Sequence, residues 1–272
     1  MVVQGGIRIK TPQQIEKMRC AGAVVWAVLD ACEQACQPGV STGELDRLAY
    51  DTFTQLGGEG LFKGYPDYEP GRGYPGHTCI SINEEIVHGI PRDDRIIIDG
   101  DLVSIDCGVR VDGWCGDSAR SILVGTVPTR TRDLVNATRN LLDLAIRHVR
   151  PGVKWGAIAR LLEQEARRDR YGIVKEYVGH GIGRLMHEPP KVPNFVSNEL
   201  MKADFELVPG MVLAIEPMLT LGTGETRALD DGWTVVTADG TPAAHIEHTV
   251  AVTFSGADVL TAGPPDDHEP HA

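Results

Sequence analysis

Residues Ser104 to Arg120 read SIDCGVRVDGWCGDSAR, and this stretch places two acidic residues on either side of a turn sequence. The segments LVSI before Asp106 and SILVG after Arg120 are rich in β-branched and apolar residues, which is typical of strands. Between them, Asp112 and Gly113 predict a two-residue type I′ turn. The sequence therefore predicts an antiparallel hairpin.

This turn determines which residues face each other across the hairpin. Asp106 pairs with Ala119, and Gly108 pairs with Asp117. The two carboxylates then lie on one face as diagonal neighbours, with Cα atoms about 7–8 Å apart. Two like charges held this close are costly without a cation between them. We therefore expect a metal site on this face.

The composition is that of an ordinary globular protein. The chain has 272 residues, of which 42% are hydrophobic and 24% are charged. Its net charge of −12 argues against a nucleic-acid-binding surface or a polybasic membrane anchor. No apolar run approaches the roughly 20 residues of a membrane span, and the first residues show no signal pattern. We expect a cytoplasmic protein without membrane or nucleic-acid contacts.

The six cysteines do not indicate a disulfide framework in a chain of this kind. Cys32 and Cys36 are four apart on an expected helix, a spacing that could bind metal. No second Cys or His pair of zinc-finger spacing accompanies them, so we expect buried free thiols.

The chain also repeats itself. PGVSTGELDRLAYDTFTQLGG begins at Pro38, and PGVKWGAIARLLEQEARRDRYG begins at Pro151. Each is a Pro-Gly turn followed by a helical pattern that stops at Gly. A further helical pattern precedes each of them, at Thr11–Gln37 and Thr131–Arg150. Further on, DGDLVSIDC around Asp106 echoes VPGMVLAIEP, and CGDSARSILV echoes HIEHTVAVTF.

These echoes predict one α/β domain over residues 11–260, built from two halves at about 11–128 and 129–260. Residues 1–10 form an N-terminal segment, and 261–272 form a disordered acidic tail. A ligand on the pseudo-twofold axis would be held by one carboxylate pair from each half: Asp106 and Asp117, and Glu216 and Glu247. Their formal charge of −4 matches two divalent ions, a common hydrolytic arrangement.

An imidazole is expected to complete such a site. VGHGIGRLMHEPP contains His180 and His187, and its glycines allow the backbone to approach a site closely. NEEIVHGIPRDD adds His88 in a similar setting. His245 and His248 flank Glu247, and we expect them to lie behind the ligands or at the surface.

Six motifs resemble the type I methionine aminopeptidases in order and spacing: NEEIVHGIP, SIDCGVRVDGWCGDSAR, VGHGIGRLMHEPP, AIEPM, DGWTV and IEHTVAV. The resemblance runs from about Thr11 to Leu260. It implies the pita-bread fold, a pseudo-twofold repeat of helix–strand halves around a central antiparallel sheet. It also implies two divalent ions, of Mn, Fe, Co or Zn.

The resemblance assigns a role to each site residue. Asp106 would bind one ion, Asp117 and Glu247 would bridge both, and His180 and Glu216 would bind the other. A water activated by the two ions would attack the scissile carbonyl.

Two further roles follow from the family pattern. Glu216 would also carry the proton from the water to the leaving amine. His88 and His187 would hydrogen-bond the substrate.

The family's methionine pocket corresponds here to Cys79, Tyr74 and Trp233. Gly71 falls where the family often has a second aromatic residue, and Met186 falls where it often has Phe. The long segment FKGYPDYEPGRGYPGHTC leaves two outcomes open. Tyr65 or Tyr68 replaces the missing aromatic residue, or the pocket is looser.

The implied activity is removal of the N-terminal methionine from nascent chains with a small second residue, by a monomer in transient contact with ribosomes. An Xaa-Pro aminopeptidase or prolidase would share the fold and ligands but usually carries a large N-terminal domain. Only about ten residues precede the first helix here. A non-catalytic peptide-binding protein of this fold would be expected to have lost ligands.

Overall fold

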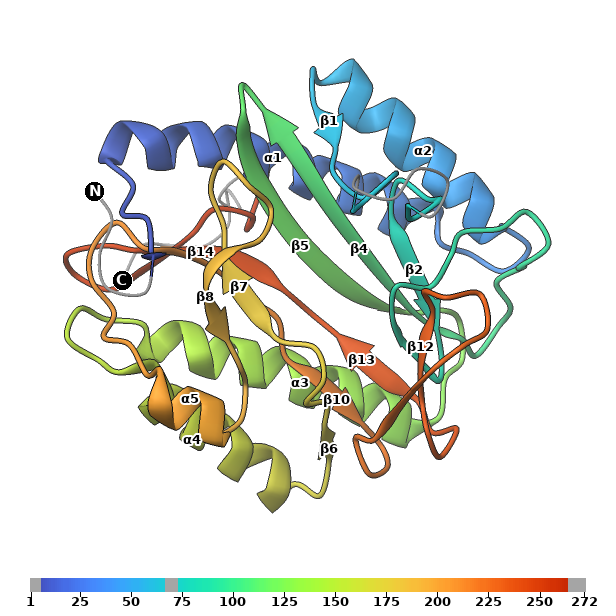
Figure 1. The fold of residues 1–272 in the computed structure, drawn as a ribbon. Helices are drawn as coiled ribbons and strands as arrows, with labels where there is room; N and C mark the ends of the chain where they lie inside the picture. The colour runs from blue at the N-terminus through green and yellow to red at the C-terminus, as the bar shows by residue number, and fades with distance from the viewer. Residues whose placement is uncertain (1–5, 67–72, 264–272) are drawn as a thin grey trace, which may run out of the picture.

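A computed structural model describes residues 6–66 and 73–263. Two pairs of helices lie on the outer side of curved antiparallel strands, and the longest strands, β4 and β5, cross the middle of the molecule (Figure 1). Within the described part of the chain, no helix is both long and apolar enough to cross a membrane.

The predicted hairpin is confirmed. It consists of β4 (Leu102–Val111) and β5 (Trp114–Leu123), joined by Asp112 and Gly113. These two residues have φ values of 49° and 75°, and a type I′ turn requires positive φ at both positions. Asp106 pairs with Ala119, and Gly108 with Asp117, as the turn predicts.

The predicted helical segments are also confirmed. These helices are α1 (Pro12–Ala35), α2 (Thr42–Gln55), α3 (Thr129–His148) and α4 (Trp155–Arg168). The short α5 (Asn198–Lys202) was not predicted. Thr11 caps α1, because its side chain accepts a hydrogen bond from the backbone of Gln14, whose side chain in turn accepts from the backbone of Thr11. Pro12 occupies the first helical position, where a missing N–H has no cost.

Within residues 6–66 and 73–263, the strands form four antiparallel sheets. One contains β1 (Glu59–Gly60), β4, β2 (Cys79–Ile82) and β5; a second contains β13 (Ala243–His245), β10 (Met218–Thr220) and β6 (Gly172–Ile173). A third contains β11 (Thr226–Ala228), β12 (Val235–Thr237) and β3 (Glu85–Val87). The largest runs β15 (Ala257–Val259), β14 (His248–Val252), β9 (Val212–Ile215), β7 (Gly179–Gly181) and β8 (Glu188–Val192).

Each half of the chain has its own hydrophobic core. α1 packs on α2, β4 and β5, and the buried side chains there include Val25, Leu45 and Ile105. α3 packs on α4, β10 and β13 around Leu134 and Trp155. This matches the expected repeat of helix–strand halves.

The two halves meet at Ala119. Its backbone N–H donates to the carbonyl of Glu247 at 3.4 Å, and the N–H of Glu247 donates to the carbonyl of Ala119 at 3.0 Å. Because Ala119 also pairs with Asp106, the side chains of Asp106 and Glu247 approach from its two sides. The small side chain of Ala119 leaves the space between them open.

The predicted free thiols are confirmed for Cys32 and Cys36, which are buried and unbridged. Burial raises the pKa of each to about 12. The predicted tail at 261–272 falls mostly outside the described residues. Its first residue corrects the predicted boundary, because Thr261 is buried and its hydroxyl accepts a hydrogen bond from the backbone N–H of Thr249 at 3.1 Å.

Candidate metal centre and substrate pocket

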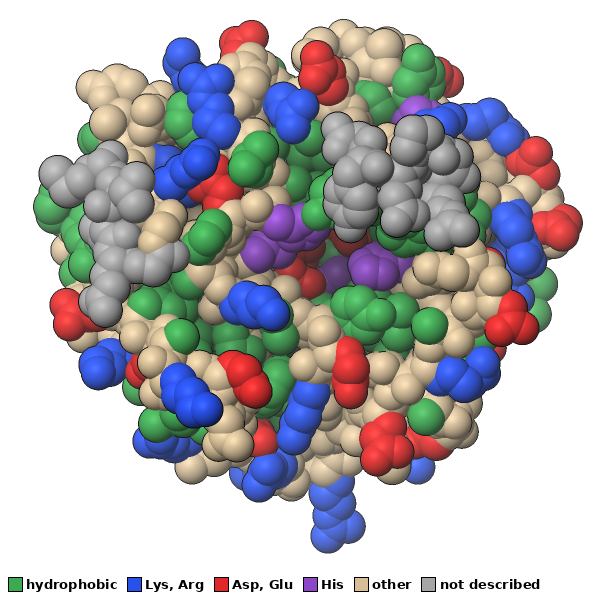
Figure 2. Space-filling view, viewed as in Figure 1, with side chains coloured by type: hydrophobic (Ala, Val, Ile, Leu, Met, Phe, Trp, Pro, Cys, Tyr) green, Lys and Arg blue, Asp and Glu red, His purple; other side chains and the backbone are tan. Residues whose placement is uncertain are grey.

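A cavity of about 230 Å³ opens on the inner side of the sheets. All ten residues singled out from the sequence line it: Tyr74, Cys79, His88, Asp106, Asp117, His180, His187, Glu216, Trp233 and Glu247. Figure 2 shows histidine side chains gathered in a hollow of this face, with acidic side chains beneath them. The sequence pattern therefore brought together residues spread over 174 positions.

The four carboxylates reach the cavity from both halves. Asp106 and Asp117 project from the paired strands β4 and β5. Glu216 directly follows β9, and Glu247 directly precedes β14. β9 and β14 are themselves paired, with Ile215 opposite His248, so the second pair of carboxylates, like the first, comes from two neighbouring antiparallel strands.

His180 joins this cluster from the middle of β7. Its Nε2 lies 3.7 Å from Oε1 of Glu216 and 3.9 Å from Oδ2 of Asp117. The glycines on either side are required by close packing. A Cβ at Gly179 would lie 2.4 Å from the carbonyl oxygen of Ala214, and one at Gly181 would clash with the neighbouring strand in the same way.

The carboxylates are buried without enough compensating donors. Oδ1 of Asp106, Oδ1 of Asp117 and Oε1 of Glu247 are enclosed and have no hydrogen-bond partner among the described residues. Burial raises the pKa of Asp117 to about 7, and burial with the charge of Asp117 raises that of Glu216 to about 8. Burial and the neighbouring carboxylates raise the pKa values of Asp106 and Glu247 as well.

The pKa values of the cavity histidines are shifted in the opposite direction, downward. Burial, together with His187, lowers the pKa of His180 to about 3 and that of His88 to about 4. Burial, together with His88, lowers the pKa of His245 to about 3. These imidazoles are therefore neutral near pH 7, which is the form that binds metals.

These shifts predict how the metal-free protein responds to pH. Between about pH 6.5 and 8, the folded carboxylates retain protons that the unfolded chain has released. The free energy of unfolding should therefore fall as the pH rises through this window. Below about pH 6.5 the lowered histidine pKa values oppose this trend. Thermal unfolding of metal-stripped protein checks this, and a melting temperature that rises from pH 6.5 to 8 contradicts it.

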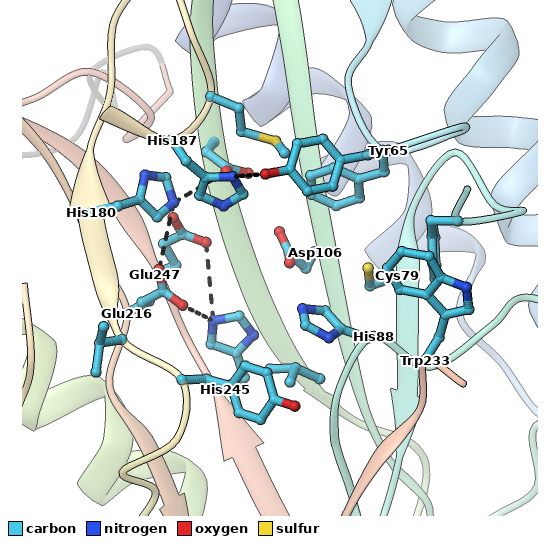
Figure 3. A pocket seen from close by; sticks show the side chains of 17 residues that line it. Tyr65, Cys79, His88, Asp106, His180, His187, Glu216, Trp233, His245 and Glu247 are labelled. Carbon is cyan, nitrogen blue, oxygen red and sulfur yellow. Dashed lines mark hydrogen bonds and ion pairs between the residues drawn. The ribbon is translucent and has the colours of Figure 1, made fainter. Parts of the chain in front are cut away.

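His88 and His187 lie on opposite sides of the cavity (Figure 3). The ring of His187 packs edge-on against His180, with centroids 4.3 Å apart. Its Nδ1 is 2.8 Å from the hydroxyl of Tyr65. His88 has a φ of 60°, a left-handed conformation that is strained for a residue with a Cβ and that occurs often at functional sites.

The apolar end of the cavity contains sulfur and aromatic side chains. Tyr74, Cys79 and Trp233 lie there, and they pack with Met186 and with Phe62, which sequence reasoning missed. The rings of Tyr74 and Trp233 meet edge to face, with centroids 5.3 Å apart. Such walls suit a thioether side chain.

Tyr65 lines the cavity, where its hydroxyl lies 2.8 Å from Nδ1 of His187. Gly71 and Tyr68 lie outside the described residues. His245 is not at the surface, because it is buried, and it lines the cavity next to Glu216 and Glu247. Its position two residues before Glu247 in an extended segment was the available signal, since i and i+2 share a face.

The residues present fit divalent cations. Nε2 of His180 and one oxygen each of Asp117 and Glu247 lie within 4.8 Å of one another. Enclosed carboxylate oxygens without donors, together with a neutral imidazole, are the donor set of a hydrolytic metal centre. The fold and this centre together define the class as a metallohydrolase with an internal repeat.

Comparisons with known proteins support this class. The family model described as metallopeptidase family M24 matches residues 16–254. A methionine aminopeptidase of Treponema pallidum is 43% identical over 94% of this chain and 96% of its own length. The crystal structure of a methionine aminopeptidase from Thermotoga maritima has a TM-score of 0.88 and 38% identity over 94% of this chain and 99% of that one.

The chain belongs to metallopeptidase family M24 and, within it, groups with the methionine aminopeptidases. Its architecture is the pita-bread fold of that family. A prolidase from Pyrococcus furiosus matches with a TM-score of 0.74 at 22% identity, and this chain covers 66% of it. That likeness is one of fold alone.

Proposed function

We propose that the protein hydrolyses the bond after an N-terminal methionine, preferring a small second residue. The observation that carries this proposal is a buried group of four carboxylates beside a pocket of sulfur and aromatic side chains. The four carboxylates are suited to binding divalent cations, and the sulfur and aromatic pocket is suited to a methionine side chain. The methionine aminopeptidase relatives support the same activity.

The proposed ligands of two divalent ions are Asp106, Asp117, His180, Glu216 and Glu247. When bound, such ions polarise a carbonyl group and lower the pKa of water toward neutrality. Manganese, iron, cobalt and zinc all suit oxygen ligands with an imidazole, so the donor set leaves the metal open.

The chain's own groups provide the remaining chemistry. Glu216 accepts a proton from the attacking water and delivers it to the leaving amine, which its position at the cavity wall allows. His88 and His187 face the cavity from two sides and donate hydrogen bonds to the substrate amide and to the oxyanion that forms. Tyr74, Cys79 and Trp233 enclose the methionine side chain and exclude water from it.

The test is release of methionine from Met-Ala-Ser by metal-stripped protein, with Mn, Fe, Co and Zn added back separately. An Ala-Pro-Ala peptide runs beside it. Metal-dependent methionine release with the control peptide intact supports the proposal. Cleavage of Ala-Pro-Ala alone moves the activity to the Xaa-Pro class, and silence on both peptides with metal bound refutes the proposed activity.

His187→Ala should lower kcat for Met-Ala-Ser about 100-fold while metal content stays unchanged. The reason is that one transition-state hydrogen-bond donor is worth roughly 10²–10³ in rate, and the proposed ligands do not include His187. Steady-state kinetics and metal analysis of the same sample provide the check. Loss of metal from this variant would contradict the role assigned to His187.

We also propose that the substrates are nascent chains met during transient ribosome contact, and that the protein acts as a cytoplasmic monomer. The net charge of −12 argues against direct binding to ribosomal RNA. Sedimentation velocity tests the monomer, and co-sedimentation with ribosomes carrying nascent chains tests the contact. A dimer, or no difference between translating and empty ribosomes, would contradict the corresponding proposal.

A further inference from the structure

His245 is a cavity histidine that the proposed ligand set does not include. It ends β13, and its side chain is 3% exposed. Its Nε2 is enclosed and has no hydrogen-bond partner among the described residues. Leaving a buried polar group unpaired costs about 1–3 kcal/mol, so this nitrogen calls for a bonding partner in the working protein.

The ring points at the two glutamates of the centre (Figure 3). Nε2 of His245 lies 3.8 Å from Oε2 of Glu216 and 4.0 Å from Oε2 of Glu247. Both distances exceed the roughly 2.7–3.2 Å of an N–H···O hydrogen bond. Two donors that each bind one divalent ion at about 2.0–2.2 Å lie roughly 3–4 Å apart. The two distances lie at the upper end of that range and leave room for a shared ion.

His180 provides an internal comparison. Its Nε2 lies 3.7 Å from Oε1 of Glu216 and 3.9 Å from a carboxylate oxygen of Asp117. The two imidazoles thus flank the two oxygens of Glu216 at nearly equal distances. His180 is already a proposed ligand, and His245 lies at nearly the same distance from the other oxygen of Glu216.

The backbone of His245 is held firmly from the other half of the molecule. Its N–H donates to Oγ of Ser121 at 3.0 Å, and the same hydroxyl donates to its carbonyl at 2.9 Å. On its other side, it pairs with Met218 of β10. These bonds fix the backbone from which the ring projects toward the carboxylates.

We propose that His245 is a second nitrogen ligand of the metal centre, next to Glu216 and Glu247. The inference rests on the proposed function in one respect, namely that divalent ions occupy the centre. An added imidazole favours zinc over manganese, because manganese prefers carboxylate and water oxygens. His245 would therefore shift the metal preference of the site toward zinc.

The first test counts imidazole ligands directly by X-ray absorption of the fully zinc-loaded protein. With His180 and His245 shared between two ions, the wild type should show about one imidazole per zinc, at the Zn–N distance of roughly 2.0–2.1 Å. His245→Gln should show half as many. An unchanged count in the variant overturns the inference.

The second test compares affinities for zinc and manganese, measured by competition titration of metal-stripped protein. His245→Gln should weaken zinc binding at least about tenfold and manganese binding no more than about twofold, because only zinc prefers the lost imidazole. A residue that merely orients a ligand would weaken both metals in parallel, by roughly 10–100-fold. A parallel loss therefore overturns the inference.

The matched control is His248→Gln. His248 follows Glu247 directly, but its ring bonds the hydroxyl of Thr261 at 2.9 Å and does not line the cavity. This variant should keep both affinities and the imidazole count. Thermal unfolding confirms that each metal-free variant is folded, and His245→Asn replaces His245→Gln if the latter is not.

The possible failures are distinguishable. If the wild-type protein binds zinc with half an imidazole per ion and still releases methionine, only the role of His245 is overturned. Wild type that binds neither metal overturns both this inference and the proposed function.

Discussion

Asp117→Asn should abolish metal-dependent methionine release and, at pH 8, make the metal-free protein more stable than the wild type. The two effects have one cause. Asp117 is a buried carboxylate whose charge raises the pKa values of Asp106, Glu216 and Glu247. The amide removes that charge without changing the shape of the side chain.

The loss of function should be large, because Asp117 is the proposed bridge between the two ions. Losing a residue that only supports a metal ligand already weakens metal affinity about 10–100-fold. Losing a charged ligand should therefore cost at least 100-fold. The backbone is unaffected, since Asp117 exchanges hydrogen bonds of 3.0 and 2.7 Å with the hydroxyl of Thr249 through main-chain atoms alone.

Three quantities are measured. Titration calorimetry gives the affinity for Mn and Zn, the peptide assay gives the rate of methionine release, and thermal unfolding gives the stability of the metal-stripped protein. Asp112→Asn is the matched control, because it makes the same chemical change on the exposed turn of the same hairpin. It should leave all three unchanged. An Asp117→Asn protein that binds metal normally, or that is less stable than the wild type at pH 8, contradicts the assigned role.

Local sequence signals predicted the hairpin and the helices well, because their causes are local. The turn at Asp112 and Gly113 determines the register of β4 and β5 and hence the face on which Asp106 and Asp117 lie. The cap at Thr11 similarly determines where α1 begins. The positions of Glu216 and Glu247 followed from a second copy of the same pattern.

The contributions of Tyr65 and His245 depend on contacts between distant segments. Tyr65 reaches the cavity through a hydrogen bond to His187, 122 positions away. His245 faces the carboxylates because Ser121, 124 positions away, holds its backbone. The i, i+2 spacing before Glu247 indicates only which face His245 occupies, and no local signal reports pairings with distant segments, so the sequence alone left both contributions open.

Lys10→Met should lower the free energy of unfolding by about 3–5 kcal/mol, the usual cost of breaking a buried ion pair by removing one partner. Lys10 lies in the segment before α1, and its Nζ is 3.0 Å from Oε2 of Glu188. Their side chains are 4% and 1% exposed, so solvent screens the pair little. In a chain of this size, the melting temperature should fall by roughly 10 °C.

The same substitution should also lower the activity, because Glu188 supports the turn that carries His187. Oε1 of Glu188 accepts hydrogen bonds from the backbone N–H groups of Arg184 at 3.0 Å and Leu185 at 3.3 Å. These bonds shape the turn that carries His187. An unpaired Glu188 would shift toward solvent or take up a proton, and either change loosens that turn. We therefore expect kcat for Met-Ala-Ser to fall together with stability, while metal content is retained.

A double-mutant cycle separates the effect of breaking the ion pair from the effect of losing packed side-chain atoms. Lys10→Met combined with Glu188→Gln should recover much of the lost stability, because no unpaired charge then remains in the interior. Arg8→Met is the control, since Arg8 lies 3.6 Å from Oε1 of Glu188 but its side chain is 52% exposed. It should change stability by less than about 1 kcal/mol. If the double variant is no more stable than Lys10→Met alone, the charge of Glu188 is not the cause, and loss of the packed lysine stem explains the effect.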